Sequence, residues 1–114
     1  MKLRKCIILL PIAYNDGTEV PPAVLLGLLK EIDEAFDGHH VAGVGDGAYK
    51  MADGTIVSDK TLDVWVVVDD RRVDELREFA AKCAAILKQE SVYFEVTAAE
   101  VEFVPPSRET GEAS

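Results

Sequence analysis

Two segments of this sequence are apolar at odd and even positions alike, and they restrict the fold more than any other feature does. One covers residues 5–13 (KCIILLPIA) and the other covers residues 61–68 (TLDVWVVV). A strand with one face in water alternates apolar and polar residues, whereas a strand covered on both faces does not. We therefore expect both segments to be inner strands of one sheet. Regular pairing of the first should end near Pro11, which has no amide hydrogen to donate.

A helical pattern follows each of these strands. The first helix is expected to begin near Pro21 or Pro22 and to end at Gly38, a residue type that is common after helix ends. The second can be capped by Asp69 or Asp70. The apolar residues at helical spacing are Leu25, Leu28, Leu29, Ile32 and Phe36 in the first helix, and Val73, Leu76, Ala80, Cys83 and Leu87 in the second.

The two remaining strands have the character of sheet edges. Asp53-Gly54 indicates a hairpin turn. The glycine-rich residues 43–47 predict a bulged or twisted edge strand rather than a phosphate-binding loop, because they lack the Lys-Ser/Thr pair of such a loop. The last strand, residues 91–104, alternates between apolar residues such as Phe94 and polar ones such as Glu95, so it should be half exposed.

The order strand, helix, strand, strand, helix, strand predicts an α+β fold of the ferredoxin-like split βαβ type. Its four-stranded antiparallel sheet has the strand order 4-1-3-2, with both helices on one face. We expect residues 1–104 to form this single domain and residues 105–114 to be a disordered tail. Because the helices cover only one face, the apolar second face of the inner strands predicts a homodimer packed sheet to sheet.

The charge and the cysteines narrow the choice of partners. A formal net charge of -9 argues against binding nucleic acid or an anionic membrane, and leaves a cationic or metal ligand, a basic protein or simple solubility. Cys6 and Cys83 have no metal-binding or redox spacing, and we expect no cofactor. Residues 2–13 imitate a signal peptide but lack a small-residue cleavage site, so we expect the protein in the cytoplasm.

The predicted topology gathers several polar loops at one rim of the sheet, because the end of the first strand lies beside the beginnings of its antiparallel neighbours. The candidate ligand-binding residues there are Tyr14, Asn15, Asp16, Glu90 and Tyr93, with Asp53 and Asp59 expected nearby. Such a cluster could hold a cation or raise the pKa of one carboxyl group, although Asp and Asn are also ordinary turn residues. We predict no catalytic residue and no metal ligand.

The histidines, the tryptophan and the cysteines, which are residue types that often bind ligands or act in catalysis, are better explained here by structural roles. His39 and His40 are adjacent and would point to opposite faces of a strand, so they do not readily share a metal ion. Trp65 lies in an inner strand, which favours a place in the core or a dimer interface over a ligand-stacking role. Neither cysteine has a base nearby in the sequence, and no serine-centred nucleophile motif is present.

Four short motifs punctuate the chain: Asn15-Asp16-Gly17, Phe36-Asp37-Gly38, Asp53-Gly54, and residues 89–96 (QESVYFEV). In this combination the sequence resembles a group of short bacterial proteins of unknown function with a ferredoxin-like βαββαβ pattern, over residues 5–104. The group supplies no activity. The resemblance implies only that Glu90, which precedes the last strand, is a residue to test first.

These observations favour a non-enzymatic module that self-associates through its sheet or binds a small ligand. The alternative is a small enzyme or metal-dependent binder that uses the acidic rim around Asp16 and Glu90, an idea that rests on fold analogy. A partner protein of the toxin, antitoxin or defence type fits the acidity but has no specific signal in the sequence.

Overall fold

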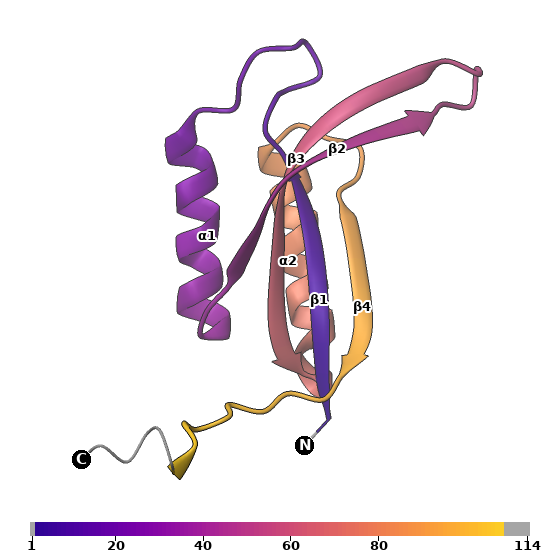
Figure 1. Ribbon diagram of the computed structural model, residues 1–114. Coiled ribbons are helices and arrows are strands. Elements are labelled where there is room, and N and C mark those ends of the chain that lie inside the picture. The colour runs from indigo at the N-terminus through magenta and orange to yellow at the C-terminus, as the bar shows by residue number, and fades with distance from the viewer. Residues whose placement is uncertain (1, 109–114) are drawn as a thin grey trace.

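The computed structural model describes residues 2–108, which form an α+β domain with one four-stranded antiparallel sheet (Figure 1). The elements are β1 (Leu3–Pro11), α1 (Pro22–Phe36), β2 (His40–Lys50), β3 (Ile56–Asp69), a 3-10 turn (Asp70–Arg72), α2 (Val73–Ile86) and β4 (Tyr93–Ala99). The strand order β2-β3-β1-β4 places β1 and β3 inside, as the doubly apolar segments predict. This arrangement is consistent with a ferredoxin-like fold.

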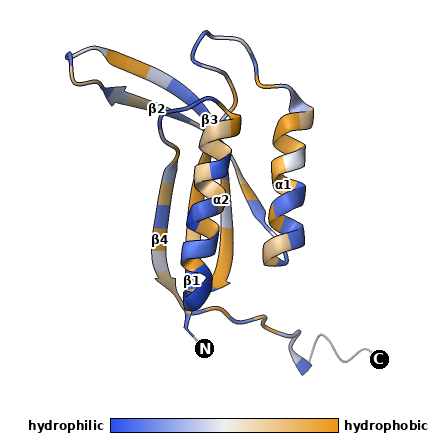
Figure 2. Cartoon of the chain, turned by 180° about the vertical axis from the view of Figure 1, so that it is seen from behind, coloured by the Kyte–Doolittle hydropathy of each residue, from blue (hydrophilic) through white to orange (hydrophobic). Residues whose placement is uncertain are grey.

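Alternate residues of the inner strands face the helices and form the core. Ile8, Val64 and Cys6 are fully buried there, together with Ile32 of α1 and Leu76 of α2. Both helices pack on this one face of the sheet (Figure 2). Each helix follows the predicted apolar stripe, so the amphipathic pattern explains which side of the helix is buried.

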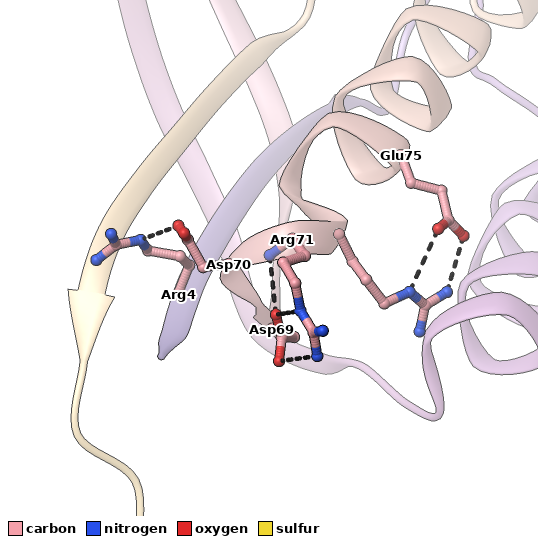
Figure 3. Close-up of polar contacts among 6 residues, drawn as sticks. Arg4, Asp69, Asp70, Arg71 and Glu75 are labelled. Atoms are coloured by element: carbon pink, nitrogen blue, oxygen red, sulfur yellow. Dashed lines mark hydrogen bonds and ion pairs between the residues drawn. The ribbon is translucent and has the colours of Figure 1, made fainter. Parts of the chain in front are cut away.

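Polar contacts join β3 to α2 and fix where the second helix begins. The Asp69 carboxylate accepts a hydrogen bond from the Arg71 amide (2.9 Å), and Arg4 of β1 pairs with Asp70 at 2.8 Å (Figure 3). Arg72 donates to the carbonyl of Ala35 (2.5 Å), which ties this junction to the end of α1. Asp69 therefore caps the 3-10 turn that leads into the second helix, whereas α2 itself begins after Arg72 without a side-chain cap, so the predicted capping of that helix is only indirect.

The end of α1 differs slightly from the expectation. Asp37 already takes the left-handed conformation (φ 66°), and Gly38 follows with φ 145°. The helix thus ends one residue earlier than a glycine terminator would require, because Asp tolerates the left-handed region better than most side chains do.

The hairpin of β2 and β3 is much longer than the sequence indicates. Pairing of β1 with β3 stops at Pro11↔Thr61, but β3 begins at Ile56 and continues to pair with β2. Residues 46–60 therefore project past the rest of the sheet, and we call them the hairpin arm (Figure 1). The predicted bulge in the glycine-rich strand is confirmed, since the register shifts between Val41 and Gly43.

The last strand is shorter than predicted. β4 ends at Ala99, which pairs with Leu3 at the start of β1, so residues 100–104 have no neighbouring strand to bond. The expected strand over residues 101–104 is therefore wrong for this chain by itself. Of the predicted tail, residues 109–114 lie outside the described residues. Within residues 2–108, no helix is both long enough and apolar enough to cross a membrane.

Candidate ligand-binding face

The structure brings together two of the loops that the topology assigns to one rim. The side-chain amide of Asn15 donates to the backbone carbonyl of Lys88 (3.4 Å), and the Lys88 ammonium lies 5.4 Å from the centre of the Tyr14 ring. The loop after β1 therefore meets the loop before β4, as predicted. Sequence reasoning overlooked Lys88, which places a cation among the residues expected to form an acidic cluster.

The carboxylates of this rim do not form the repelling cluster that the sequence suggested. Asp16 accepts hydrogen bonds from the Thr18 hydroxyl (2.6 Å) and amide (2.9 Å), and these bonds hold the pKa of Asp16 below its usual range rather than above it. Asp53, which was expected nearby, lies at the tip of the hairpin arm, so that expectation is wrong.

Glu90 is exposed, and its carboxylate has no hydrogen bond or ion pair with another residue of the described chain. Among residues 2–108, no group of three or more His, Cys, Asp or Glu side chains is arranged to hold a metal ion. The rim is thus a set of turn residues around Lys88, and nothing in its geometry concentrates negative charge.

Tyr93 lies on a different surface, the sheet face that points away from the helices. We call this surface the open face. Its residues are Leu3, Lys5, Ile7 and Leu9 of β1, Asp63, Trp65 and Val67 of β3, Tyr93, Glu95 and Thr97 of β4, and His40 of β2. The central apolar side chains are only half buried, because no element of the described chain covers them.

An aromatic and cationic cluster occupies the middle of the open face. The His40 ring stacks on Trp65, with ring centres 4.5 Å apart and planes inclined by 24°. The Lys5 ammonium lies 4.9 Å from the Trp65 ring centre, within the range of a cation–π contact. His39 bonds instead to Asp33 of α1 (2.5 Å), so the two histidines face different surroundings, as their adjacency in the sequence predicts.

Polar side chains of β2, β3 and β4 lie near the place where the hairpin arm leaves the sheet, on the two sides of β1. The Tyr93 hydroxyl donates to Glu95 (2.7 Å), and this bond, with repulsion from Glu95 and Tyr49, raises the pKa of Tyr93. The Asp63 carboxylate accepts from the Thr61 hydroxyl (2.5 Å). We call Tyr49, Asp63, Tyr93 and Glu95 the arm base.

Glycines in β2 make room for two of these side chains. A Cβ atom added to Gly45 would stand 2.6 Å from a carboxylate oxygen of Asp63, so that side chain lies directly over the glycine backbone. Tyr49 lies in the same way over Gly47, with its hydroxyl 3.3 Å from the added atom. The glycine-rich motif therefore lets polar side chains lie flat across the sheet, a function that its sequence alone does not reveal.

The arm base offers phenol donors and carboxylate acceptors on a surface with apolar neighbours. Such groups can bind hydroxyl or amine groups of a ligand, and the carboxylates favour a cationic one. A separate hollow of about 440 Å³ lies at the opposite end of the strands, lined by Lys2, Leu3, Arg4, Ala98, Ala99, Glu100 and Val101. It lies where residues 100–104 leave the sheet.

Solved structures resemble this fold. No family model matches the chain, and no curated protein matches it. A phage SAM lyase in complex with S-methyl-5'-thioadenosine matches with a TM-score of 0.64 at 11% identity, over 91% of this chain and 93% of that one. A phage SAM lyase in its apo state gives a TM-score of 0.58 at 12% identity, over 91% and 92%.

At such identities the likeness concerns the fold alone. It supports the α+β arrangement over nearly the whole chain. The resemblance to short bacterial proteins of unknown function stays a prediction, since neither structural match bears on it.

Proposed function

We propose that this ferredoxin-like chain is a small-ligand-binding module that self-associates through the open face of its sheet. One observation carries the proposal: the inner strands place Ile7, Trp65 and Val67 on a face that no described element covers. Apolar patches of this kind on small domains commonly mark interaction or ligand-binding surfaces. The sequence favours a cytoplasmic protein, and we propose that it acts there.

Self-association explains why the inner strands are apolar on both faces. The helices already bury the side chains that alternate with these residues, so the fold does not require Trp65 or Val67 to be apolar. A second copy that packs its own open face against the first removes both surfaces from water and gains free energy in proportion to the apolar area buried. Each sheet then lies inside the dimer.

The ligand is expected at the arm base, where polar side chains border the apolar face. Glu95 and Asp63 favour an amine or a sulfonium group, while the hydroxyls of Tyr93 and Tyr49 suit the hydroxyl groups of a sugar. A nucleoside that carries a cationic side chain combines these features. The likeness to a phage SAM lyase supports this ligand class, because S-adenosylmethionine is a nucleoside derivative with a cationic sulfonium group.

Calorimetry and thermal denaturation with S-methyl-5'-thioadenosine and S-adenosylmethionine test the ligand proposal. We expect at least one of them to raise the melting temperature of the wild type, and Glu95→Gln to weaken that shift for a cationic ligand, because the substitution removes a negative charge while an amide oxygen can still accept the Tyr93 bond. Glu78→Gln, an equally small change at an exposed position of α2, is the matched control. A wild type that neither nucleoside stabilises contradicts the ligand class.

A second candidate is an enzyme that acts on S-adenosylmethionine, and the structural likeness to phage SAM lyases favours it over other reactions. Chromatography of S-adenosylmethionine incubated with the protein distinguishes the two candidates. Binding without loss of the compound supports the module, whereas its consumption supports the enzyme. Comparing Glu90→Gln with Glu95→Gln then separates the rim from the arm base as the location of the chemistry.

A further inference from the structure

The two edges of the sheet differ in how well they are protected against pairing with another strand. Proteins block an edge strand, whose amide and carbonyl groups lack partners, with bulges, lysines or prolines. β2 forms one edge, and it has a bulge after Val41 and ends on Lys50. β4 forms the other edge, and residues 93–99 (YFEVTAA) contain no lysine, no proline and no register shift. Within residues 2–108, nothing pairs with its outer side (Figure 1).

The strand pattern of β4 continues beyond its end, into residues 100–104 (EVEFV), which we call the C-terminal segment. The alternation of β4 keeps its phase there, so Val101 and Phe103 belong to the same set of residues as Tyr93, which lies on the open face. Phe103 is 97% exposed. The segment has no partner strand in its own chain, because β1 begins opposite Ala99.

A second copy of the chain can supply a partner for β4 and for the C-terminal segment at once. In an antiparallel pair of identical strands related by a two-fold axis, the beginning of each strand lies beside the end of the other. The β4 strand of one copy then lies beside the C-terminal segment of its partner, and the reverse. Because opposite residues of such a pair lie on the same face, the open faces of the two copies stay on the same side.

The glutamates restrict the register of this pair. Like charges directly opposite each other destabilise a sheet, and a two-fold axis at Glu100 would set that residue against its own copy. An axis at Ala98 pairs residues 93–103 of both copies and leaves no two glutamates opposite each other. It also sets Tyr93 opposite the partner's Phe103, and aromatic pairs of this kind stabilise a sheet.

The helix-covered face supplies a positive charge at the same register. Arg77 of α2 lies over the Phe94 ring, with its guanidinium carbon 5.5 Å from the ring centre. With Ala98 at the axis, Phe94 stands opposite the partner's Glu102, whose carboxylate then comes within reach of the guanidinium group. Arg77 already pairs with Asp74, but its five N–H donors can serve two carboxylates. Two copies with a net charge of -9 repel each other, and this contact offsets part of that repulsion.

We propose that β4 and the C-terminal segment pair with the same residues of a second copy, antiparallel and centred on Ala98, so that the two sheets join into one. The proposal goes beyond the proposed function, because the contact uses the edge of the sheet and leaves the open face free. When the pair forms, the C-terminal segment leaves its path beneath the strand ends (Figure 1) and extends in line with β4. The open faces of the two copies then form one continuous surface.

Oxidative cross-linking of the full-length chain with diamide tests the register. In Ala98→Cys the two new thiols meet at the axis, where opposite Cα atoms are about 4.5–5.5 Å apart, within the range of a disulfide. In the matched control Ala99→Cys the two positions are diagonal neighbours roughly 7–8 Å apart, which is too far. We expect a disulfide-linked dimer of the first variant alone. The native Cys6 and Cys83 are buried and do not compete.

Two prolines in the C-terminal segment test the pairing itself. Val101→Pro combined with Glu102→Pro should leave the folded chain intact, because residues 100–104 pair with no strand of their own copy. Successive amides of a strand point to opposite sides, so one of the two prolines removes a donor that faces the partner. Sedimentation equilibrium should show a dimer dissociation constant about tenfold higher or more. Val104→Pro, just beyond the paired residues, is the control and should leave the constant unchanged.

A charge exchange tests the contact between Arg77 and Glu102. Arg77→Glu should weaken the dimer, and adding Glu102→Arg should restore much of the loss because opposite charges meet again. Adding Glu34→Arg instead gives the same net charge, but Glu34 is exposed on α1, which α2 separates from β4 (Figure 2), so it should not restore the dimer. Equal recovery by both double variants would show that net charge alone matters, and the proposed contact would be overturned.

The outcomes separate edge pairing from association through the open face. If Trp65→Ser lowers the state of association while the double proline variant does not, the open face is an interface and edge pairing is overturned. If the double proline variant dissociates the protein and Trp65→Ser does not, edge pairing stands and association through the open face fails. Equal cross-linking of Ala98→Cys and Ala99→Cys overturns the inferred register. A wild type that is monomeric at micromolar concentration overturns both proposals.

Discussion

The inner strands have two faces built from alternate residues of the same segments. The helices bury one of these faces, and no described element covers the other. Ile8 and Val66 point toward the helices and are buried within one chain, whereas Ile7 and Val67, their neighbours, lie on the open face and are only half buried. Similar side chains thus have different roles on the two faces. One face stabilises the fold, and the other is available to a ligand or to a second copy.

The largest expected effect is on the covered face. Ile8→Ala leaves a cavity between the sheet and the helices and should lower the free energy of unfolding by about 2–5 kcal/mol. Ile7→Ala removes the same atoms from the open face and should cost much less at concentrations where the chain is monomeric. Urea denaturation monitored by tryptophan fluorescence measures both. Equal losses for the two variants would mean that the open face is already covered in the monomer.

Removal of Trp65 has the next largest effect, and it appears in association rather than in folding. If the open face forms an interface, the melting temperature of the wild type rises with protein concentration, because association stabilises the folded state by mass action. Trp65→Ala should reduce this dependence. A calorimetric dilution series of both proteins measures it, and Leu26→Ala, exposed on α1, serves as the control that keeps the dependence.

The sequence predicts the covered face well and the open face poorly, for a physical reason. Burial within one chain leaves periodic apolar patterns, so the inner strands, both helices and the Asp53-Gly54 turn can be found by inspection. The length of the hairpin arm cannot, because it depends on where β1 stops pairing with β3, and no local residue other than Pro11 marks that point.

The need to know strand pairing also explains why the contacts of the candidate site could be predicted only in part. The contact of Asn15 with Lys88 follows from topology alone, and it was predicted as a meeting of two loops. The stacking of His40 on Trp65 depends on the β2–β3 register, and that register is shifted by the bulge before Gly43. Contacts within a sheet face require the register of each strand pair, and sequence patterns fix that register only where one face is clearly polar.

A pair of glycine substitutions tests whether the polar end of the open face is ordered. In Gly45→Ala the new methyl group displaces the Asp63 carboxylate, which breaks its bond with Thr61 and should cost about 1 kcal/mol of unfolding free energy. Gly27→Ala, in the interior of α1 with no atom near its added Cβ, should stabilise the protein by about 0.5–1 kcal/mol. Denaturation midpoints give both values. A neutral Gly45→Ala would show that Asp63 does not hold its place over the strand.

The smallest effect is a difference in alkaline stability between the two faces. Burial raises the pKa of Cys83, in the core, from its ordinary value of 9.0 to about 12, and the bond to Glu95 raises the pKa of Tyr93 on the open face. Each group keeps its proton longer in the folded chain than in the unfolded one. Its contribution to stability is therefore complete below its unfolded pKa and is lost as the pH rises through the folded pKa.

Stability should accordingly fall above pH 9 through Cys83 and further above pH 10 through Tyr93. Cys83→Ala should flatten this fall over the whole range above pH 9, and Tyr93→Phe only above pH 10, because the phenylalanine ring keeps the contacts of the tyrosine but has no proton to lose. Melting temperatures of the three proteins between pH 8 and 11.5 check this, with deprotonation of lysines cancelling in the differences. If Tyr93→Phe instead left the fall unchanged, the hydrogen bond to Glu95 would not persist in solution, and the arm base would lose the contact that orders the Tyr93 hydroxyl.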